Sequence, residues 1–148
     1  MATIKRSALV PYSVHDMYSL VNDVSSYPQF VEGCVAVDII EHTQEKMQAT
    51  LKLKKAGLQL SFTTCNQLIV DQSIDMQLQD GPFEHFSGIW QFKALNDSAC
   101  KLSLDLEFEF KSRTFGRLAT PMFSEVANNL VDAFCQRAEY IYKRESND

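Results

Sequence analysis

The C-terminal third of the sequence constrains the fold most, because an alternating strand there leads directly into a long amphipathic helix. Over residues 101–110, leucine or phenylalanine alternates with polar or charged residues, which predicts a strand with one buried and one solvated face. Over residues 118–141, apolar residues recur every three or four positions, which predicts one face of a helix. An apolar sheet face needs a cover, and the chain supplies one long helix for it. A broad sheet under a single helix favours an unfilled apolar space of the kind that binds ligands.

Length and composition predict one cytoplasmic domain that spans residues 1–148. The net charge of −5 argues against a general affinity for nucleic acid, and DNA is not an expected partner. No apolar run approaches the ~20 residues of a transmembrane helix, and we expect no signal or transit segment. The four cysteines are far apart and include no C-x-x-C pair, as expected of reduced thiols in the cytoplasm.

The rest of the sequence predicts a strand, two helices and six further strands before the long helix. Ser13 is expected to cap the first helix, and Pro28 is expected in the first turn of the second, within residues 27–31. Short polar turns between the later strands favour antiparallel hairpins over crossover connections. We therefore expect an α+β domain in which a curved antiparallel sheet wraps around the C-terminal helix. The expected strands cover residues 3–10, 35–41, 47–54, 58–64, 74–79, 86–92 and 101–110.

Pro121 interrupts the pattern of the long helix, since proline cannot donate the backbone hydrogen bond that a helix interior requires. We expect a kink or a fresh helix start near Thr120 and Pro121. Residues 113–121 would then form a looser segment at the mouth of the expected cavity.

Three segments of the sequence stand out as a set that spans nearly the whole chain. They are LVNDVSSYPQFVEGC at residues 20–34, GPFEHFSGIWQF at residues 81–92 and LVDAFCQRA at residues 130–138. In this order and at this spacing they resemble the signature of the START-like coenzyme Q-binding family. The sequence departs from the family at Glu32, where proline is frequent, and at Phe86, where leucine is usual. The resemblance implies a helix-grip fold of the START and Bet v 1 type.

The same resemblance implies two functional themes. The first is non-enzymatic binding of ubiquinone or a similar isoprenoid lipid in the cavity between sheet and helix, in support of respiration. The alternative is that of the bacterial RatA members, toxins that bind the large ribosomal subunit and block subunit association. A cyclase or dehydratase that uses the same cavity is a third, less favoured interpretation.

The expected ligand-binding residues are apolar side chains on the inward faces of the strands and the long helix. For any one of them a role in the packed core is the alternative, but together they outnumber what one helix can cover. No cofactor is obligatory in this interpretation, although a bound ubiquinone or other isoprenoid would fit. The three histidines lack the spacing of metal ligands, so we expect no metal site. The candidates are Phe62, Met76, Trp90, Phe92, Met122 and Val126.

Arg113 and Arg117 at the start of the long helix are the candidate contacts to ribosomal phosphates. Solubilising surface charge is the alternative for them, and residues 52–55 form a second small basic cluster with the same ambiguity. An enzyme would need an inward polar group such as His85, but the alternation places His85 on the face opposite Trp90. No nucleophile or phosphate-binding motif is present, so we expect no catalytic residues.

Overall fold

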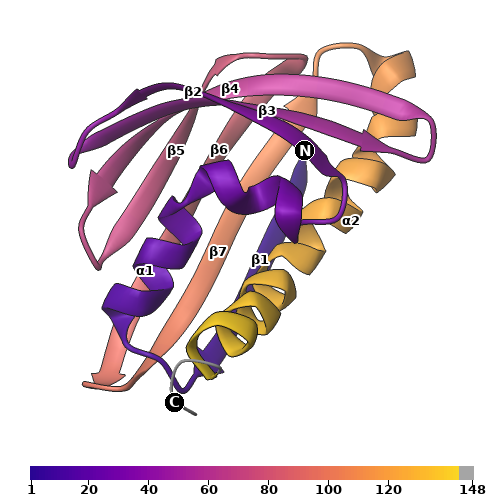
Figure 1. The fold of residues 1–148 in the computed structure, drawn as a ribbon. Helices are drawn as coiled ribbons and strands as arrows, with labels where there is room; N and C mark the ends of the chain where they lie inside the picture. The colour runs from indigo at the N-terminus through magenta and orange to yellow at the C-terminus, as the bar shows by residue number, and fades with distance from the viewer. Residues whose placement is uncertain (144–148) are drawn as a thin grey trace.

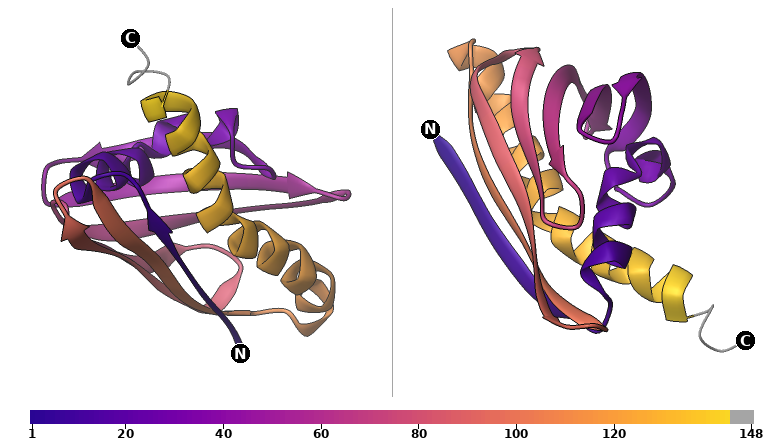
Figure 2. Two further views of the ribbon diagram at one scale, coloured as in Figure 1. Left: turned by 90° about the horizontal axis from the view of Figure 1, so that it is seen from below. Right: turned by 90° about the vertical axis from the view of Figure 1, so that its left-hand side faces the viewer.

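The computed structural model describes residues 1–143 as one antiparallel sheet with all helices on its concave side (Figure 1 and Figure 2). The expected α+β helix-grip architecture, with a curved sheet around a long C-terminal helix, is confirmed. The elements are β1 (Ala2–Val10), α1 (Val14–Asn22), η1 (Val24–Gln29), β2 (Cys34–His42), β3 (Lys46–Lys55), β4 (Leu58–Ile69), β5 (Ser73–Asp80), β6 (Phe83–Asn96), β7 (Ala99–Phe110), α2 (Arg113–Ala138) and η2 (Glu139–Lys143).

The sheet has seven strands in the order β1-β7-β6-β5-β4-β3-β2. From β2 to β7 each strand pairs with the next along the chain, as the short polar turns predicted. β1 instead pairs with β7, with Ile4 opposite Leu106, so the first strand of the chain lies beside the last. The inward face of β7 is buried along its length, and this confirms the alternation seen in residues 101–110.

Side-chain caps start both α-helices. The Ser13 hydroxyl accepts a hydrogen bond from the Asp16 backbone N–H at 3.1 Å, at the position where the cap was predicted. The Ser112 hydroxyl accepts one from the Phe115 backbone N–H at 3.0 Å and so begins α2 directly after β7. The turn from β7 into α2 is therefore short, and it folds the long helix back across the sheet (Figure 1).

The second helix differs from the prediction. It is a 3₁₀-helix that begins at Val24, so Pro28 lies near its end and not in its first turn. The backbone bond from Ser26 N–H to the Asp23 carbonyl starts this helix immediately after α1, before the stretch that suggested a helix. Pro28 is tolerated there because it is exposed and the helix ends one residue later.

α2 continues from Arg113 to Ala138 through Pro121, so the prediction of a fresh helix start is wrong. Pro121 is exposed, and solvent can therefore satisfy the carbonyl of Arg117 that loses its partner. Ala119 before the proline and Phe123 after it are both buried, so packing holds the two parts on the sheet as one helix.

A cluster of phenylalanine rings fills one end of the space between sheet and α2. Phe83 is at its centre, 1% exposed, with its ring stacked on Phe110 at a centroid distance of 4.6 Å. Phe123 of α2 packs edge-on against Phe108 of β7 at 4.7 Å and so fixes the helix to the sheet. The phenylalanine cluster consists of Phe62, Phe83, Phe86, Phe108, Phe110 and Phe123.

Replacement of Phe83 by alanine is expected to lower the free energy of unfolding by about 3–5 kcal/mol, because it leaves a cavity in the centre of the cluster. Urea denaturation of the purified chain measures this change. Leu95→Ala is the matched control, because Leu95 is 52% exposed on β6, and its effect should stay within about 0.5 kcal/mol. A decrease below about 1 kcal/mol for Phe83→Ala would show that the cluster contributes little to stability.

Candidate functional site

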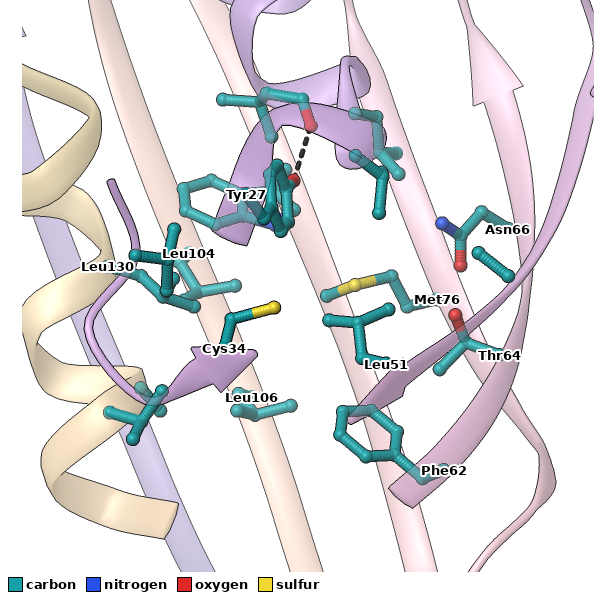
Figure 3. Close-up of a pocket in the computed structure, with 18 of the residues that line it drawn as sticks. Tyr27, Cys34, Leu51, Phe62, Thr64, Asn66, Met76, Leu104, Leu106 and Leu130 are labelled. Carbon is teal, nitrogen blue, oxygen red and sulfur yellow. Dashed lines mark hydrogen bonds between the residues drawn. The ribbon is translucent and has the colours of Figure 1, made fainter. Parts of the chain in front are cut away.

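An apolar cavity of about 80 Å³ lies between the concave face of the sheet, η1 and α2 (Figure 3). Its walls come from the inward side chains of β3 to β7, from the end of α1 and from the middle of α2. The cavity exists because three separate segments, α1, η1 and α2, share the task of covering one broad sheet face. Most of the lining is aliphatic or aromatic, so water inside it would gain few hydrogen bonds.

Four of the six predicted ligand-binding residues line this cavity. Phe62 and Trp90 enter from the sheet and are 6% and 3% exposed, and Trp90 packs edge-on against Phe134 of α2 at 5.3 Å. Met76 of β5 and Val126 of α2 complete the set. All four therefore border the same apolar space.

Phe92 and Met122 lie outside the lining. Phe92 faces the same side of β6 as Trp90, but its ring packs edge-on against Tyr18 of α1 at 5.6 Å, which fills that space. Met122 is 5% exposed, and the ring of the next residue, Phe123, takes the position that faces the cavity. Both residues belong to the packed core in this structure.

Tyr27 is a cavity residue that the sequence reasoning missed. Its hydroxyl donates a hydrogen bond to the Val21 carbonyl and so ties η1 to α1 (Figure 3). Burial raises the pKa of Tyr27, and burial likewise raises the pKa of the Cys34 thiol beside the cavity. Both groups therefore stay protonated near neutral pH, and the Cys34 thiol is not an activated nucleophile.

Thr64 and Asn66 were also missed, and they are the buried polar side chains among the described residues, at 3% and 5% exposure. They follow Phe62 at spacings of two on the inward face of β4. The expected strand at residues 58–64 already places Thr64 on this face, and extension of the alternation past residue 64 would add Asn66. The Asn66 Oδ1 atom is buried and has no hydrogen-bond partner within residues 1–143. Asn22, at the end of α1, lines the cavity too, and its Oδ1 atom is likewise buried without a hydrogen-bond partner within residues 1–143.

A charged group, Lys55 at the end of β3, contacts both α2 and the loop before β2. Its Nζ atom lies 2.9 Å from Glu125 Oε1 on α2 and 3.2 Å from Glu32 Oε1 in the loop before β2. Hydrogen bonds to Glu125 and Glu32 raise the pKa of Lys55. Gly33 lies in close contact with α2, because a Cβ atom built there would be 3.0 Å from Val126 Cγ2. We call the contact of Lys55 with Glu32 and Glu125 the Lys55 bridge, and it joins β3 to α2 and to the loop before β2.

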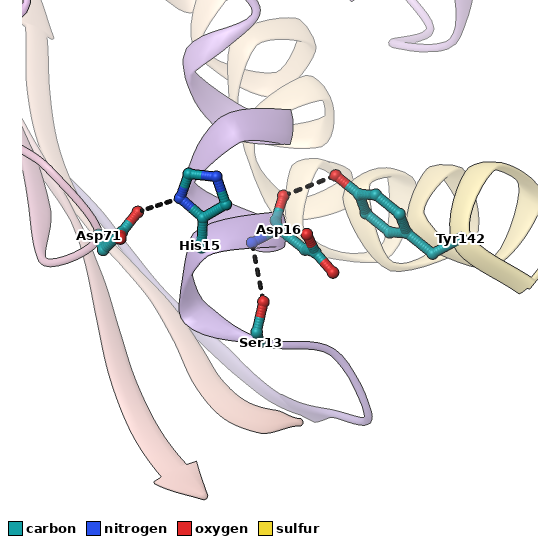
Figure 4. Close-up of polar contacts among 5 residues, drawn as sticks. All are labelled: Ser13, His15, Asp16, Asp71 and Tyr142. Atoms are coloured by element: carbon teal, nitrogen blue, oxygen red, sulfur yellow. Dashed lines mark hydrogen bonds and ion pairs between the residues drawn. The ribbon is translucent and has the colours of Figure 1, made fainter. Parts of the chain in front are cut away.

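Polar contacts also hold α1 in place (Figure 4). His15 Nδ1 lies 3.0 Å from Asp71 Oδ1 in the turn between β4 and β5. Tyr142 donates its hydroxyl hydrogen to the Asp16 carbonyl at 2.8 Å, which joins the end of the C-terminal helical region to the start of α1. These contacts therefore hold the start of α1 from two sides.

The basic residues divide into paired and unpaired groups. Arg113 and Arg117 are exposed in the first turns of α2, and neither has an acidic partner within residues 1–143. In the second predicted cluster, Lys52 pairs with Asp38 at 3.8 Å and Lys55 forms the bridge described above. Arg113 and Arg117 are thus cations that an anionic partner can contact without first displacing a carboxylate.

His85 lies on the outer face of the sheet, as the alternation predicted. Its Nε2 atom is 3.8 Å from Glu107 Oε2, and the cavity lies on the other side of the sheet. Within residues 1–143, no group of three or more histidine, cysteine or acidic side chains is arranged to hold a metal ion. In the same part of the chain, no helix has both the length and the hydropathy that a membrane crossing requires.

The fold has close structural counterparts. The crystal structure of the Zhui aromatase/cyclase from Streptomyces sp. R1128 superposes with a TM-score of 0.82 at 17% identity, over 93% of each chain. A START superfamily protein from Mycobacterium smegmatis gives a TM-score of 0.78 at 22% identity, over 94% of this chain and 98% of that one. At these identities the likeness concerns the fold alone.

Sequence comparison gives nearer relatives. The chain is 45% identical over 139 residues to the ribosome association toxin RatA of Pseudomonas aeruginosa, which covers 94% of this chain and 96% of that protein. It is 46% identical over 142 residues to RatA of Escherichia coli K12, covering 96% and 90%. The mitochondrial coenzyme Q-binding protein COQ10 of Drosophila melanogaster is 31% identical over 135 residues, covering 88% of this chain and 56% of that protein. Residues 10–135 match the polyketide cyclase/dehydrase and lipid transport family model, and the chain belongs to this START-like family.

Proposed function

We propose that this chain is a ribosome-association factor that acts in the cytoplasm by binding the large ribosomal subunit and blocking its joining to the small subunit. The observation that carries the proposal is the identity of 45% and 46% to two RatA proteins, over at least nine tenths of each chain. A likeness of this extent includes the surface as well as the core, so residues that contact a partner fall within the matched region.

The start of α2 supplies a surface suited to this role. We define the α2 basic patch as Lys111, Arg113 and Arg117, which are all exposed and have no acidic partner within residues 1–143. Arg113 and Arg117 are one helical turn apart and so lie on the same side of α2. Leu118, 61% exposed, adds an apolar contact beside them. Since the net charge of the chain is −5, contact with ribosomal RNA depends on a local patch of this kind.

Charge reversal in the patch tests the proposal. Arg113→Glu with Arg117→Glu is expected to abolish co-sedimentation of the chain with purified large subunits in sucrose gradients. For the single reversal variants, which retain partial binding, the plot of log affinity against log salt should become shallower by about one for each phosphate that the chain no longer neutralises. The measurement is repeated over a series of salt concentrations.

Lys93→Glu with Lys101→Glu is the matched control for this experiment. These two lysines face each other on β6 and β7, they are exposed, and their reversal changes the net charge by the same amount. The control should bind nearly as well as the unmodified chain. Equal weakening by both double variants would mean that net charge, and not the α2 basic patch, decides binding.

A second candidate function is non-enzymatic binding of a hydrophobic ligand such as ubiquinone or another isoprenoid. The apolar cavity favours it, as does the 31% identity to a protein named for coenzyme Q binding. Burial of apolar ligand surface would contribute roughly 25 cal/mol per Å², less the cost of ordering the ligand. The cavity of about 80 Å³ is smaller than the ~150 Å³ that admits benzene in an engineered protein, so a ring can enter only if the walls move.

Organic extraction of the purified chain followed by mass spectrometry tests this second function. A quinone or isoprenoid should be found at a substantial fraction of one molecule per chain, because apolar burial makes such a ligand slow to leave. An exposed apolar surface can collect lipid from any lysate, so Trp90→Ala, altered within the cavity, should be extracted in parallel. Equal lipid from both chains, or none from either, would contradict a cavity ligand.

Opening of the cavity at the Lys55 bridge can be followed through Cys34. Lys55→Met keeps the length of the side chain but removes its charge, so the loop before β2 is released from α2. Alkylation of Cys34 by N-ethylmaleimide, followed by peptide mass spectrometry, should accelerate at least about twofold relative to Cys100, which is fully buried in β7. Unchanged relative rates would mean that the bridge does not control access.

A further inference from the structure

The polar residues that line the cavity restrict the chemistry of a ligand more than the volume of the cavity does. Asn66 is 5% exposed, and the Oδ1 atom of its carboxamide is buried without a hydrogen-bond partner within residues 1–143. We infer that Asn66 binds the neutral, hydroxyl-bearing head group of an otherwise apolar ligand. This inference rests on the ligand-binding function proposed above and concerns the chemistry of that ligand.

Structural requirements of the sheet do not account for Asn66. The inward face of β4 needs apolar side chains at this depth, as Phe62 and Leu68 of the same face illustrate. A buried amide without a partner lowers stability, because it gives up its hydrogen bonds to water and receives none in return. A polar group that is buried without a hydrogen-bond partner is expected at a binding site, where a ligand supplies the partner.

A second amide oxygen lines the same cavity. Asn22 Oδ1 is buried and lacks a partner within residues 1–143, and Asn22 enters the cavity from α1. A hydroxyl group both donates and accepts a hydrogen bond, so one hydroxyl can satisfy an amide oxygen and an amide N–H together. Thr64, two residues before Asn66 on the same face of β4, adds a further hydroxyl at this end (Figure 3). A hydrocarbon would leave the two amide oxygens, of Asn22 and Asn66, without a hydrogen-bond donor.

The charge of the lining restricts the ligand further. No lysine, arginine, histidine, aspartate or glutamate of residues 1–143 is among those that line the cavity. A carboxylate or phosphate head would therefore be buried without a counter-ion, which costs far more than burial of a neutral group. The cavity thus favours a neutral hydroxyl compound over a fatty acid or a phospholipid of similar length.

The strands beside Asn66 allow this end of the cavity to enlarge. Met47 on β3 and Met76 on β5 are its cross-strand partners. Methionine has an unbranched, flexible side chain that can take up new positions around a ligand. Gly88 on β6 leaves room for Met76, since a Cβ atom there would lie 2.9 Å from Met76 Cε. A head group larger than the present space can therefore enter by displacement of methionine side chains.

The test uses the full chain labelled with ¹³C at its methionine methyl groups, whose five signals include those of Met47 and Met76. The chain is titrated with geraniol, geranic acid and the hydrocarbon 2,6-dimethyloctane. Geraniol is expected to shift the Met47 and Met76 signals and to bind more tightly than either of the other probes. Asn66→Leu should weaken geraniol binding about five- to tenfold and leave 2,6-dimethyloctane binding unchanged.

Gln67→Leu is the matched control, because Gln67 is the next residue on β4 and faces outward, exposed. Gln67→Leu should leave the affinities for geraniol and for 2,6-dimethyloctane unchanged. The melting temperature of Asn66→Leu should equal or exceed that of the unmodified chain, because the substitution removes an unsatisfied buried amide. If Asn66→Leu does not fold, the same titrations on Thr64→Val are expected to weaken geraniol binding selectively.

Three results would overturn the inference. Equal affinity for geraniol and 2,6-dimethyloctane, unaffected by Asn66→Leu, would leave ligand binding intact but remove the role of Asn66. Geranic acid bound as tightly as geraniol at pH 7 would contradict the neutral head group. Met47 and Met76 signals that move with none of the probes would remove both the head-group assignment and the cavity function on which it rests.

Discussion

The concave apolar face of the sheet is wider than any one helix can cover, and most of the structure follows from this constraint. α2 packs mainly on β1 and β7 and reaches β4, α1 packs on β6 and β7, and η1 packs on β2 (Figure 1 and Figure 2). Between α1, η1 and α2, the side chains of these segments have to fill the space above the sheet, and their length is limited. The phenylalanine cluster fills one end, and the cavity lies beside it, lined in part by Phe62, Phe86 and Phe123.

The contacts around the cavity explain the two departures from the family pattern. Glu32 stands where proline is frequent, and its carboxylate supplies one of the two partners of Lys55. Phe86 replaces the usual leucine, and its ring lines the cavity and contacts Phe62 and Phe83. The first change adds an ion pair between β3 and the loop before β2, and the second adds an aromatic ring to the cavity wall.

Periodicity predicted the elements well, because it reflects which faces must be buried. The alternation in β7 and the apolar stripe of α2 both follow from contact with the same core, and the cap at Ser13 follows from local hydrogen bonding. The helix start expected near Pro121 was wrong because Pro121 is exposed, so that water can replace the missing backbone hydrogen bond. This exposure is a property of the tertiary structure that the local sequence does not show. Phe92 and Met122 were placed on the correct, inward face, but neither lines the cavity. Periodicity gives the face of a side chain, whereas contact with Tyr18 and the position of Phe123 determine which inward side chains border the empty space.

The proposed ribosome contact and the proposed ligand site do not compete for the same surface. The α2 basic patch lies at the exposed start of α2, whereas Val126 and Leu130 face the cavity from the middle of the same helix. Because α2 is continuous through Pro121, its two parts are joined by backbone hydrogen bonds and not by a loose segment. A ligand that displaces Val126 would therefore act on a rigid element that also carries Arg113 and Arg117. Whether ligand changes ribosome affinity then depends on one quantity, the difference in ligand affinity between two positions of α2.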